Sequence, residues 1–264
     1  MISLCTLASG SSGNCTYVGL GGQHFLVDAG ISGKRIEHAL QELKINIRDL
    51  SGVFVTHEHR DHITAVGVLA RRFKIPVYAT PFTWRYFLRH GVIGVVAEDL
   101  IRHIVPGQVL DIGGVVVTAF DISHDASQPA GYSFEFDEEK AVIATDLGHV
   151  TDTVRQHLKG AGVIMIESNH DPEMLERGPY PRQLKDRVAG NRGHLSNAAA
   201  GMLLVEAAST RLEYIVLAHL SEDNNSPMIA FDTVKRILDV NDVHVKQLII
   251  AERHHIGEMV LYGD

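Results

Sequence analysis

Apolar runs of strand length alternate with segments of helical period along most of the chain. The runs at 15–20 and 23–30 flank Gly21-Gly22, a pair typical of a hairpin turn. From Ser32, a potential N-cap, apolar residues recur at helical spacing through Leu43. The pattern therefore predicts a hairpin followed by a helix near the start of the chain.

The same alternation continues to the C-terminus and predicts an α/β fold. Strands and helices mix in both halves, which favours two packed mixed sheets with helices on both outer faces, a four-layer αββα sandwich. No repeat, low-complexity tract or linker interrupts residues 1–264, so a single domain is expected. The further strands are expected at 52–56, 76–79, 101–105, 115–120, 131–136, 141–145, 163–167 and 213–217, with a closing pair near 246–251 and 256–262; the helices at 62–73, 81–88, 151–158, 196–208 and 227–238.

Composition narrows the class of protein. With 264 residues, 45% hydrophobic and 21% charged, the chain can bury a core and does not resemble a disordered one. No apolar run is long enough to span a bilayer, and the N-terminus lacks the pattern of a signal peptide, so no membrane partner is expected. Two cysteines, Cys5 and Cys15, cannot form a disulfide framework and indicate a reducing, cytoplasmic location. A net charge of -8 means that a polyanion would need a local basic patch or bound metal.

The chain holds 16 histidines, and several gather in one segment directly after the strand at 52–56. In Thr56-His57-Glu58-His59-Arg60-Asp61-His62, the first two histidines stand two residues apart and can point to one side of an extended chain. Three imidazoles and a carboxylate are costly to bury unpaired, and a divalent cation would pair them. The alternative is a solvated, histidine-rich loop, which does not explain why an apolar strand leads straight into the cluster.

Three more metal-capable residues follow later apolar runs. His124, Asp146 and His219 stand just past the runs that end near 122, 145 and 218, as His57 does after its strand. One such residue would be an ordinary cap or turn residue. Four in one chain indicate that strand ends converge on a common site.

These motifs resemble the metallo-β-lactamase superfamily. HEHRDH matches that family's HxHxDH signature, and the later His, Asp and His follow in the family's order. The segments LASGSSGN, FLVDAG, ISHDA, ESNHD, GHLSN and AHLSEDNN are similar to the YycJ/WalJ branch, bacterial proteins regarded as DNA exonucleases. The resemblance spans nearly the whole chain and implies the metallo-β-lactamase fold.

The resemblance also implies a ligand set for two divalent ions, zinc or manganese. It implies that Asp28 orients a ligand or the start of the helix, and that the loop from Ser9 to Asn14, with Ser12, lines the site. The same loop could equally be a simple turn. The implied ligands are His57, His59 and His124 for the first ion, Asp61, His62 and His219 for the second, and Asp146 as the bridge.

Two such ions would activate a bridging water as the nucleophile and offset charge on a scissile phosphate. His194, just before a helix that Ser196 could cap, is the candidate proton donor to the leaving group, and Asp61 shares the catalytic centre; a plain helix-entry histidine is the alternative. Glu167 could orient His194. His170 could line the pocket or pair only with a local carbonyl.

A basic stretch from Arg177 to Arg192 leads to His194. Because no recognition helix or base-reading motif is present, binding of DNA without sequence preference is expected. The stretch could also be a solvated helix face. Its candidate substrate-binding residues are Tyr180, for base stacking, with Arg182, Lys185, Arg187 and Arg192, for phosphate contacts.

The expected function is metal-dependent phosphodiester hydrolysis, by resemblance a 5′→3′ DNA exonuclease. The alternatives are a hydrolase of a small phosphodiester, such as a cyclic nucleotide or sugar phosphate, and a metal-containing binding protein without hydrolysis. A thioesterase of the glyoxalase II type fits less well, because the 45 residues after His219 are too few for a helical substrate domain.

Overall fold

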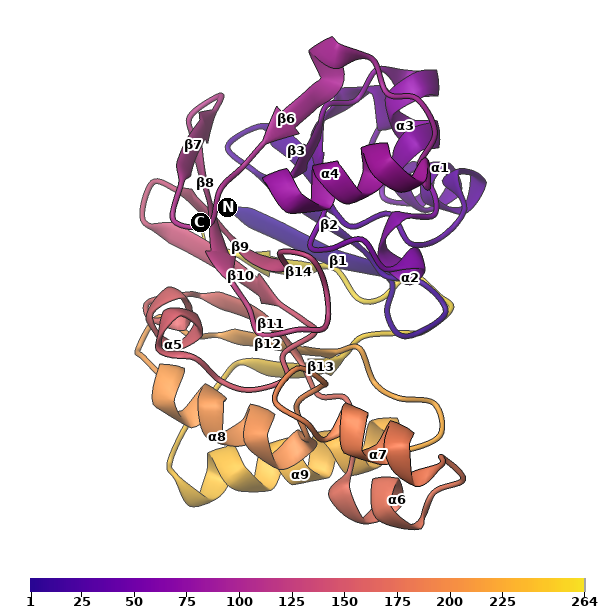
Figure 1. The fold of residues 1–264 in the computed structure, drawn as a ribbon. Coiled ribbons are helices and arrows are strands. Elements are labelled where there is room, and N and C mark those ends of the chain that lie inside the picture. The colour runs from indigo at the N-terminus through magenta and orange to yellow at the C-terminus, as the bar shows by residue number, and fades with distance from the viewer. Residues whose placement is uncertain (264) are drawn as a thin grey trace.

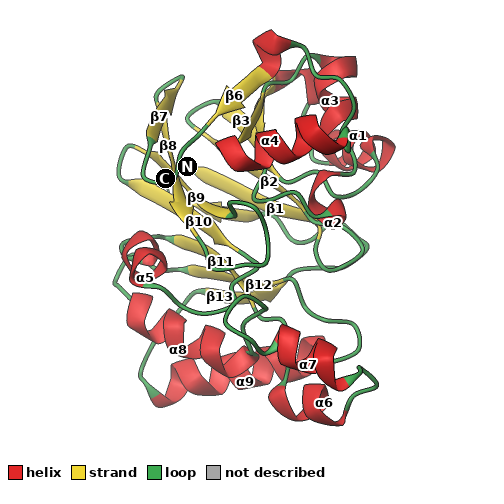
Figure 2. Cartoon of the chain, viewed as in Figure 1, coloured by secondary structure: helices red, strands yellow, loops and turns green. Residues whose placement is uncertain are grey.

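The computed structural model describes residues 1–263, which form two seven-stranded mixed sheets packed face to face (Figures 1 and 2). The first sheet has the order β14-β1-β2-β3-β4-β5-β6, and the second has the order β13-β12-β11-β10-β9-β8-β7. The first contains β1 (Ile2–Ala8), β2 (Cys15–Leu20), β3 (Gln23–Val27), β4 (Leu50–Phe54), β5 (Val77–Ala79), β6 (Ile101–His103) and β14 (Val260–Tyr262). The second contains β7 (Val109–Ile112), β8 (Val115–Asp121), β9 (Ala130–Phe136), β10 (Glu139–Ala144), β11 (Val163–Glu167), β12 (Tyr214–Ala218) and β13 (Gln247–Ile250).

Each sheet has an antiparallel part and a parallel part. From β14 to β3 and from β7 to β10 the neighbours are antiparallel, and from β3 to β6 and from β10 to β13 they are parallel. Parallel neighbours need crossover connections, and helices supply most of them. Loops at the carboxyl ends of parallel strands are the usual place for a site in such sheets.

Helices cover both outer faces, so the predicted four-layer α/β sandwich is confirmed. In Figure 1 the N-terminal helices lie above the sandwich and the C-terminal helices below it. The helices are α1 (Gly33–Glu42), α2 (Arg60–Ile63), α3 (Val66–Phe73), α4 (Pro81–His90), α5 (Asp152–Leu158), α6 (Pro172–Arg177), α7 (Arg182–Val188), α8 (Asn197–Ala207) and α9 (Pro227–Val240), with 3-10 turns at Ile47–Asp49 and Glu98–Leu100.

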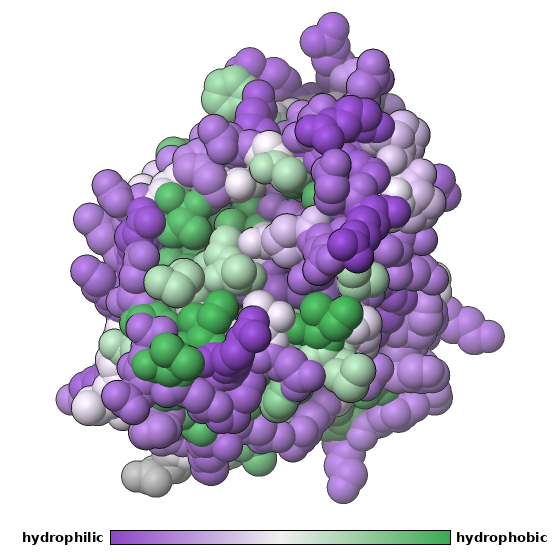
Figure 3. Space-filling view, turned by 90° about the horizontal axis from the view of Figure 1, so that it is seen from below, coloured by the Kyte–Doolittle hydropathy of each residue, from purple (hydrophilic) through white to green (hydrophobic). Residues whose placement is uncertain are grey.

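Three apolar clusters hold the layers together. Phe25, Phe54 and Phe134 belong to the cluster between the two sheets, where their rings make edge and tilted contacts. Separate clusters lie between each sheet and its helices; Trp84 of α4 belongs to one and Leu204 of α8 to the other. Seen from below, the surface is mostly hydrophilic with separate hydrophobic spots (Figure 3).

Local capping explains where several predicted helices begin. Ser32, Thr80 and Ser196 each accept a hydrogen bond from the backbone N–H three residues ahead, and α1, α4 and α8 begin directly after them. Pro81 at the first position of α4 has no N–H to leave unsatisfied. These sequence signals therefore predicted the starts of the three helices.

One predicted helix, 62–73, is wrong, because the structure divides it. α2 ends at Ile63 and α3 begins at Val66. A continuous helix would require the Ala65 N–H to donate to the Asp61 carbonyl. The Ala65 N–H donates instead to the Ala29 carbonyl, and the Asp61 carbonyl accepts a hydrogen bond from the Asn14 N–H. Tertiary hydrogen bonds to neighbouring loops thus end α2 after one turn.

The elements at the sheet edges agree in part with those expected. Both closing segments, near 246–251 and 256–262, contain strands, but these lie in different sheets: β13 adds to β12 of the second sheet and β14 to β1 of the first. Strand β7 and helix α6 were not expected. No helix among residues 1–263 is both long and apolar enough to cross a bilayer, and Cys5 and Cys15 are buried free thiols.

Candidate metal centre

The site forms at one edge of the sandwich, where loops follow the ends of parallel strands. Asp28 follows β3, His57 follows β4, Asp146 follows β10 and His219 follows β12. Asp28, Asp146 and His219 all adopt left-handed backbone conformations, with φ of 62°, 59° and 57°. Such strained conformations concentrate at functional sites. The sharp turns direct these side chains out of their strands and toward one another.

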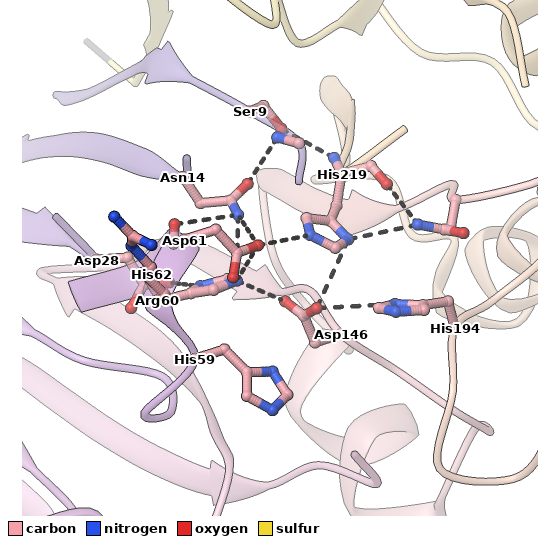
Figure 4. A network of polar contacts seen from close by, with 12 residues as sticks. Ser9, Asn14, Asp28, His59, Arg60, Asp61, His62, Asp146, His194 and His219 are labelled. Atoms are coloured by element: carbon pink, nitrogen blue, oxygen red, sulfur yellow. Dashed lines mark hydrogen bonds and ion pairs between the residues drawn. The ribbon is translucent and has the colours of Figure 1, made fainter. Parts of the chain in front are cut away.

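The structure brings the seven expected ligands together. The carboxylate of Asp146 lies between two triads: its Oδ2 is 3.6 Å from His62 Nε2 and its Oδ1 is 3.7 Å from His124 Nε2. In Figure 4 His62, His194 and His219 surround this carboxylate. Potential ligand atoms lie within 4.8 Å of one another in four groups: His57/His59/His124, Asp61/His62/His219, His57/His62/Asp146 and Asp146/Glu167/His194/His219.

Two buried polar atoms at the centre of this cluster have no hydrogen-bond partner among the described residues. They are His219 Nε2 and Asp146 Oδ2. A buried polar atom left unpaired costs about 1–3 kcal/mol, so native proteins rarely leave two together. A divalent cation accepts both an imidazole nitrogen and a carboxylate oxygen as ligands. The donor set therefore fits a divalent-metal site.

Neighbouring groups fix the orientation of the ligand rings. Asp28 Oδ2 is 2.7 Å from His62 Nδ1, and Asp28 also accepts hydrogen bonds from the Thr56 N–H at 2.8 Å and the Thr56 hydroxyl at 2.9 Å. His124 Nδ1 lies 3.1 Å from the Gly193 carbonyl. Because each Nδ1 has its own acceptor, the Nε2 atoms of His62 and His124 remain free to face the site.

The loop from Ser9 to Asn14 is fastened to the ligand segment. The Asn14 N–H donates to the Asp61 carbonyl at 2.7 Å, and its side-chain Nδ2 is 3.4 Å from Asp61 Oδ2. Gly30 packs so closely here that a Cβ would lie 1.6 Å from the Asp61 carbonyl oxygen. Ser9 accepts a hydrogen bond from the His219 N–H at 2.8 Å. Ser12, expected to line the site, is exposed and faces a neighbouring depression.

Glu167, fully buried at the end of β11, joins His194 to the metal-ligand cluster. Its Oε1 is 2.7 Å from His194 Nδ1 and 2.9 Å from His219 Nδ1. Its Oε2 accepts hydrogen bonds from the backbone N–H groups of Leu147 at 2.8 Å and Leu195 at 3.0 Å. The carboxylate thus uses both oxygens to hold two rings and two loops in register.

The charges in the cluster are strongly coupled. Burial alone would lower the pKa of His219, but Asp146, Asp61 and Glu167 outweigh it and raise the pKa to about 10. Burial would also lower the pKa of His62, but Asp28 and Asp146 outweigh it and raise that pKa well above the ordinary range. Burial lowers the pKa of His57, helped by the neighbouring histidines. The neighbouring carboxylates therefore favour the protonated forms of His62 and His219 in the metal-free cluster.

Metal binding should consequently release protons. A metal-bound imidazole is deprotonated at its ligating nitrogen, whereas His219 with a pKa of about 10 holds a proton at pH 7 in the metal-free protein. Affinity should therefore rise with pH between about 6 and 9. Calorimetric titration with zinc in buffers of different ionisation enthalpy measures the protons released. The control is His149→Gln, which replaces a histidine that belongs to none of the four groups of possible ligands. Zinc binding without proton release would contradict the assignment.

A pocket of about 270 Å³ opens beside the cluster, and α7 and the loop before it, with Tyr180, form one wall. Arg187 pairs with Asp125 at 2.9 Å, and the Arg192 guanidinium lies 3.3 Å from the His124 carbonyl. Leu184 and Val188 add an apolar surface. The lining comprises Ser11, His59, Asp61, His124, Asp125, Asp146, Tyr180, Leu184, Arg187, Val188, Arg192, Gly193, His194 and His219.

Two residues of the basic stretch from Arg177 to Arg192 that were expected to bind substrate do not line this pocket. Arg182 pairs with Glu176 at 3.2 Å and Asp186 at 2.9 Å, and Lys185 donates to the Glu176 carbonyl. Helix α6 places Glu176 beside this basic stretch, and no local pattern in the sequence indicates that Glu176 pairs with Arg182. His170 is also outside the lining; it is buried, and its Nδ1 has no partner among the described residues.

Sequence reasoning missed several residues that support the site. Asn169 donates from Nδ2 to the His219 carbonyl at 2.9 Å. Glu58 Oε1 accepts a hydrogen bond at 2.7 Å from the N–H of Ser127, which follows His124 by three residues. Thr56 links Asp28 to the ligand segment. The motifs ESNHD and THEHRDH contain three of these residues, but only the folded structure assigns their partners.

Comparisons with known proteins identify the family of the chain. The Beta-lactamase superfamily domain matches residues 23–219. Exodeoxyribonuclease YycJ of Bacillus anthracis is 42% identical over 233 residues, 88% of each chain, and Exodeoxyribonuclease WalJ of Streptococcus pneumoniae is 37% identical over 239 residues, 90% of this chain and 89% of that one. The metallo-beta-lactamase fold protein YhfI of Bacillus subtilis superposes with a TM-score of 0.70 at 17% identity, covering 98% of this chain and 99% of its own.

The matched range contains all seven residues of the metal-ligand cluster, from His57 to His219, and the likeness to YycJ and WalJ extends over most of each chain. Together with the two-sheet fold, this establishes both the superfamily and the branch. The chain is a metal-dependent hydrolase that belongs to the metallo-β-lactamase superfamily, in the family of YycJ and WalJ.

Proposed function

We propose that the chain is an exodeoxyribonuclease that hydrolyses the phosphodiester bonds of DNA from the 5′ end, without sequence preference. The observation that carries the proposal is the joining of the metal-ligand cluster to His194 through Glu167. The metal-ligand cluster would supply an electrophilic centre, and His194 would supply a proton donor. The names of the YycJ and WalJ relatives support DNA as the substrate, and the polarity rests on the resemblance to that branch.

Each side chain then has a defined task. His57, His59 and His124 would hold one ion, Asp61, His62 and His219 would hold the second, and Asp146 would contact both. When bound, such a pair supplies a Lewis acid for the phosphoryl oxygen and lowers the pKa of a coordinated water. Asp28 and the Gly193 carbonyl keep the Nε2 atoms of two ligand rings directed at the site.

His194 would act on the leaving oxygen. Its Nδ1 faces Glu167, whose oxygens only accept when ionised, so Nδ1 is the donor and Nε2 is left for the substrate. His194 lines the pocket and remains partly exposed, with 21% of its side chain accessible. A buried carboxylate behind an acid–base histidine fixes the ring in one tautomer and orientation. As an imidazolium, His194 would also carry a proton on Nε2; it would give this proton to the leaving alkoxide and keep the one on Nδ1.

The wall of the pocket suits a terminal nucleotide. Tyr180, Leu184 and Val188 present one aromatic and two apolar surfaces against which a base can pack. Arg187 and Arg192 line the same pocket and carry charge that complements phosphate, although Arg187 shares its charge with Asp125. None of these side chains is arranged to read base edges. The buried free thiols Cys5 and Cys15 suit an enzyme of the reducing cytoplasm, where we place this activity.

The direct test uses duplex DNA labelled at either 5′ end or 3′ end, with the manganese- or zinc-loaded protein. Release of labelled mononucleotide from the 5′ label before the strand shortens from the other end supports the proposal. Early release from the 3′ label would overturn the polarity. Turnover of small phosphodiesters without any degradation of DNA would overturn the nuclease assignment.

His194→Ala should separate proton donation from the rest of the reaction. Loss of a general acid costs about 10²–10⁴-fold when the leaving group is a poor one, such as the sugar alkoxide of DNA. An ester that releases nitrophenolate needs no proton and should lose less than about tenfold. Rates on both substrates are the measurement, with His157→Ala, a ring stacked on Phe120, as control. Equal losses on both substrates would show that His194 is not the acid.

A further inference from the structure

Two further depressions adjoin the catalytic pocket and together form a groove that begins at the metal site. The depression next to the catalytic pocket has a volume of about 460 Å³ and shares Ser11 and Asp61 with that pocket. A third depression of about 350 Å³ follows and shares Ile31 and Arg35 with the second. The shared residues make the three hollows successive parts of one path across the surface.

Unpaired positive charge lies along this path. Arg60, directly before the ligand Asp61, and Arg35, on the first turn of α1, both line the second depression and are exposed. Neither has a carboxylate partner within 4.0 Å among residues 1–263. The Arg35 side chain makes one hydrogen bond, from Nη2 to the His254 carbonyl at 3.1 Å. Both guanidinium groups therefore remain available to an anion.

The carboxylates along the path are already engaged. Asp61 belongs to the metal-ligand cluster, and Glu42, at the far end, lies 2.9 Å from His38 Nε2. The hydroxyls of Ser11 and Ser12, both exposed, add hydrogen-bond donors near Arg60. The contrast with α7 is clear, because Arg182 and Arg187 there are each paired with a carboxylate.

We propose that this groove, through Arg60 and Arg35, binds the phosphate backbone of the nucleic-acid strand whose terminal nucleotide occupies the Tyr180 pocket. The inference rests on the proposed function and adds the path of the uncleaved strand. Such a strand presents a phosphate at every nucleotide, and guanidinium groups bind phosphate in a bidentate manner. Because the chain is acidic overall, a polyanion can bind only where positive charge is locally unpaired, as it is along this groove.

The test compares Arg35→Gln/Arg60→Gln with wild type and with Arg236→Gln, an exposed arginine of α9 without an ion pair among the described residues. Fluorescence anisotropy in chelator follows binding of a labelled single strand of about twenty nucleotides as salt is raised. The double variant should bind about tenfold more weakly, and its salt slope should fall by about 0.7 for each phosphate that is no longer neutralised. Binding and slope equal to those of wild type would overturn the proposal.

Two additions keep the result specific. Arg35→Lys retains the charge and should retain most of the affinity; if it binds as weakly as the double variant, packing rather than phosphate binding is responsible and the proposal fails. Arg60→Gln alone removes a side chain that makes no hydrogen bond in the described structure. This variant should therefore fold normally, and the salt dependence of its DNA binding should still fall.

With metal, the KM of the double variant should rise more for the long strand than for a dinucleotide. Wild type that cleaves neither DNA substrate would refute the proposed function instead.

Discussion

Replacing Asp146 by asparagine is expected to lower hydrolysis by at least about a thousandfold while the chain stays folded. The Asp146 carboxylate lies between the two ligand triads, 3.6–3.7 Å from the ring nitrogens of His62, His124 and His219. An amide in its place has no charge to offset that of a cation and offers one oxygen instead of two. The metal content of the purified variant should fall together with its turnover.

Asparagine is the informative substitution because of the backbone. Asp146 has φ of 59°, a left-handed conformation that asparagine tolerates and that β-branched or bulky residues do not. Asp137→Asn makes the same exchange at φ of 54° in the exposed turn between β9 and β10, and should leave turnover and metal content unchanged. If Asp146→Asn kept full metal content and the wild-type rate, Asp146 would not be a ligand.

The ligand side chains could be predicted because short-range signals and strand ends identify them. HEHRDH places four of them within six residues, and an apolar run precedes each of His57 and Asp146. The two-sheet architecture could be predicted for a similar reason, since strand-length and helix-period segments are visible locally. The family resemblance then supplied the order in which His124, Asp146 and His219 complete the set.

Long-range pairings could not be predicted in the same way. The division of helix 62–73 depends on the Ala29 carbonyl, more than thirty residues away, and the neutralisation of Arg187 depends on Asp125. The stretch 177–192 looked basic partly because two of its acidic partners, Glu176 and Asp125, lie outside it. Arg35 and Arg60 gave no comparable signal, because an isolated arginine in sequence does not reveal that it will lack a partner on the surface.

Glu167→Gln is the second substitution with a large expected effect, on stability as well as activity. Wild-type Glu167 accepts four hydrogen bonds, two from backbone N–H groups and two from imidazoles. A glutamine amide must turn its NH₂ toward one of these pairs and so leaves donors facing donors. We expect the free energy of unfolding to fall by about 2–4 kcal/mol. Urea denaturation measures it, with Glu206→Gln, which loses only a surface ion pair to Arg155, as control.

The pH dependence has a definite sign. Burial would raise the pKa of Glu167, but His194 and His219 outweigh burial and hold it below the ordinary range. A carboxyl whose pKa is lowered by folding stabilises the protein above its unfolded pKa of about 4.3 and loses that contribution as pH falls toward the lowered value. The stability difference between wild type and Glu167→Gln should therefore be full at pH 6–7 and shrink below about pH 4.

A double-mutant cycle tests whether Glu167 acts through His194. If the carboxylate positions that ring, Glu167→Gln should slow DNA hydrolysis by about 10–100-fold and the nitrophenyl ester less, the same selectivity as His194→Ala. Combined with His194→Ala, it should then add little further loss on DNA, because both changes remove one function. Losses that multiply, with no difference between the two substrates, would mean that Glu167 acts only through His219 and the metal-ligand cluster. In that case the link from β11 to the leaving group would be structural, and proton donation would have to come from another group in the pocket.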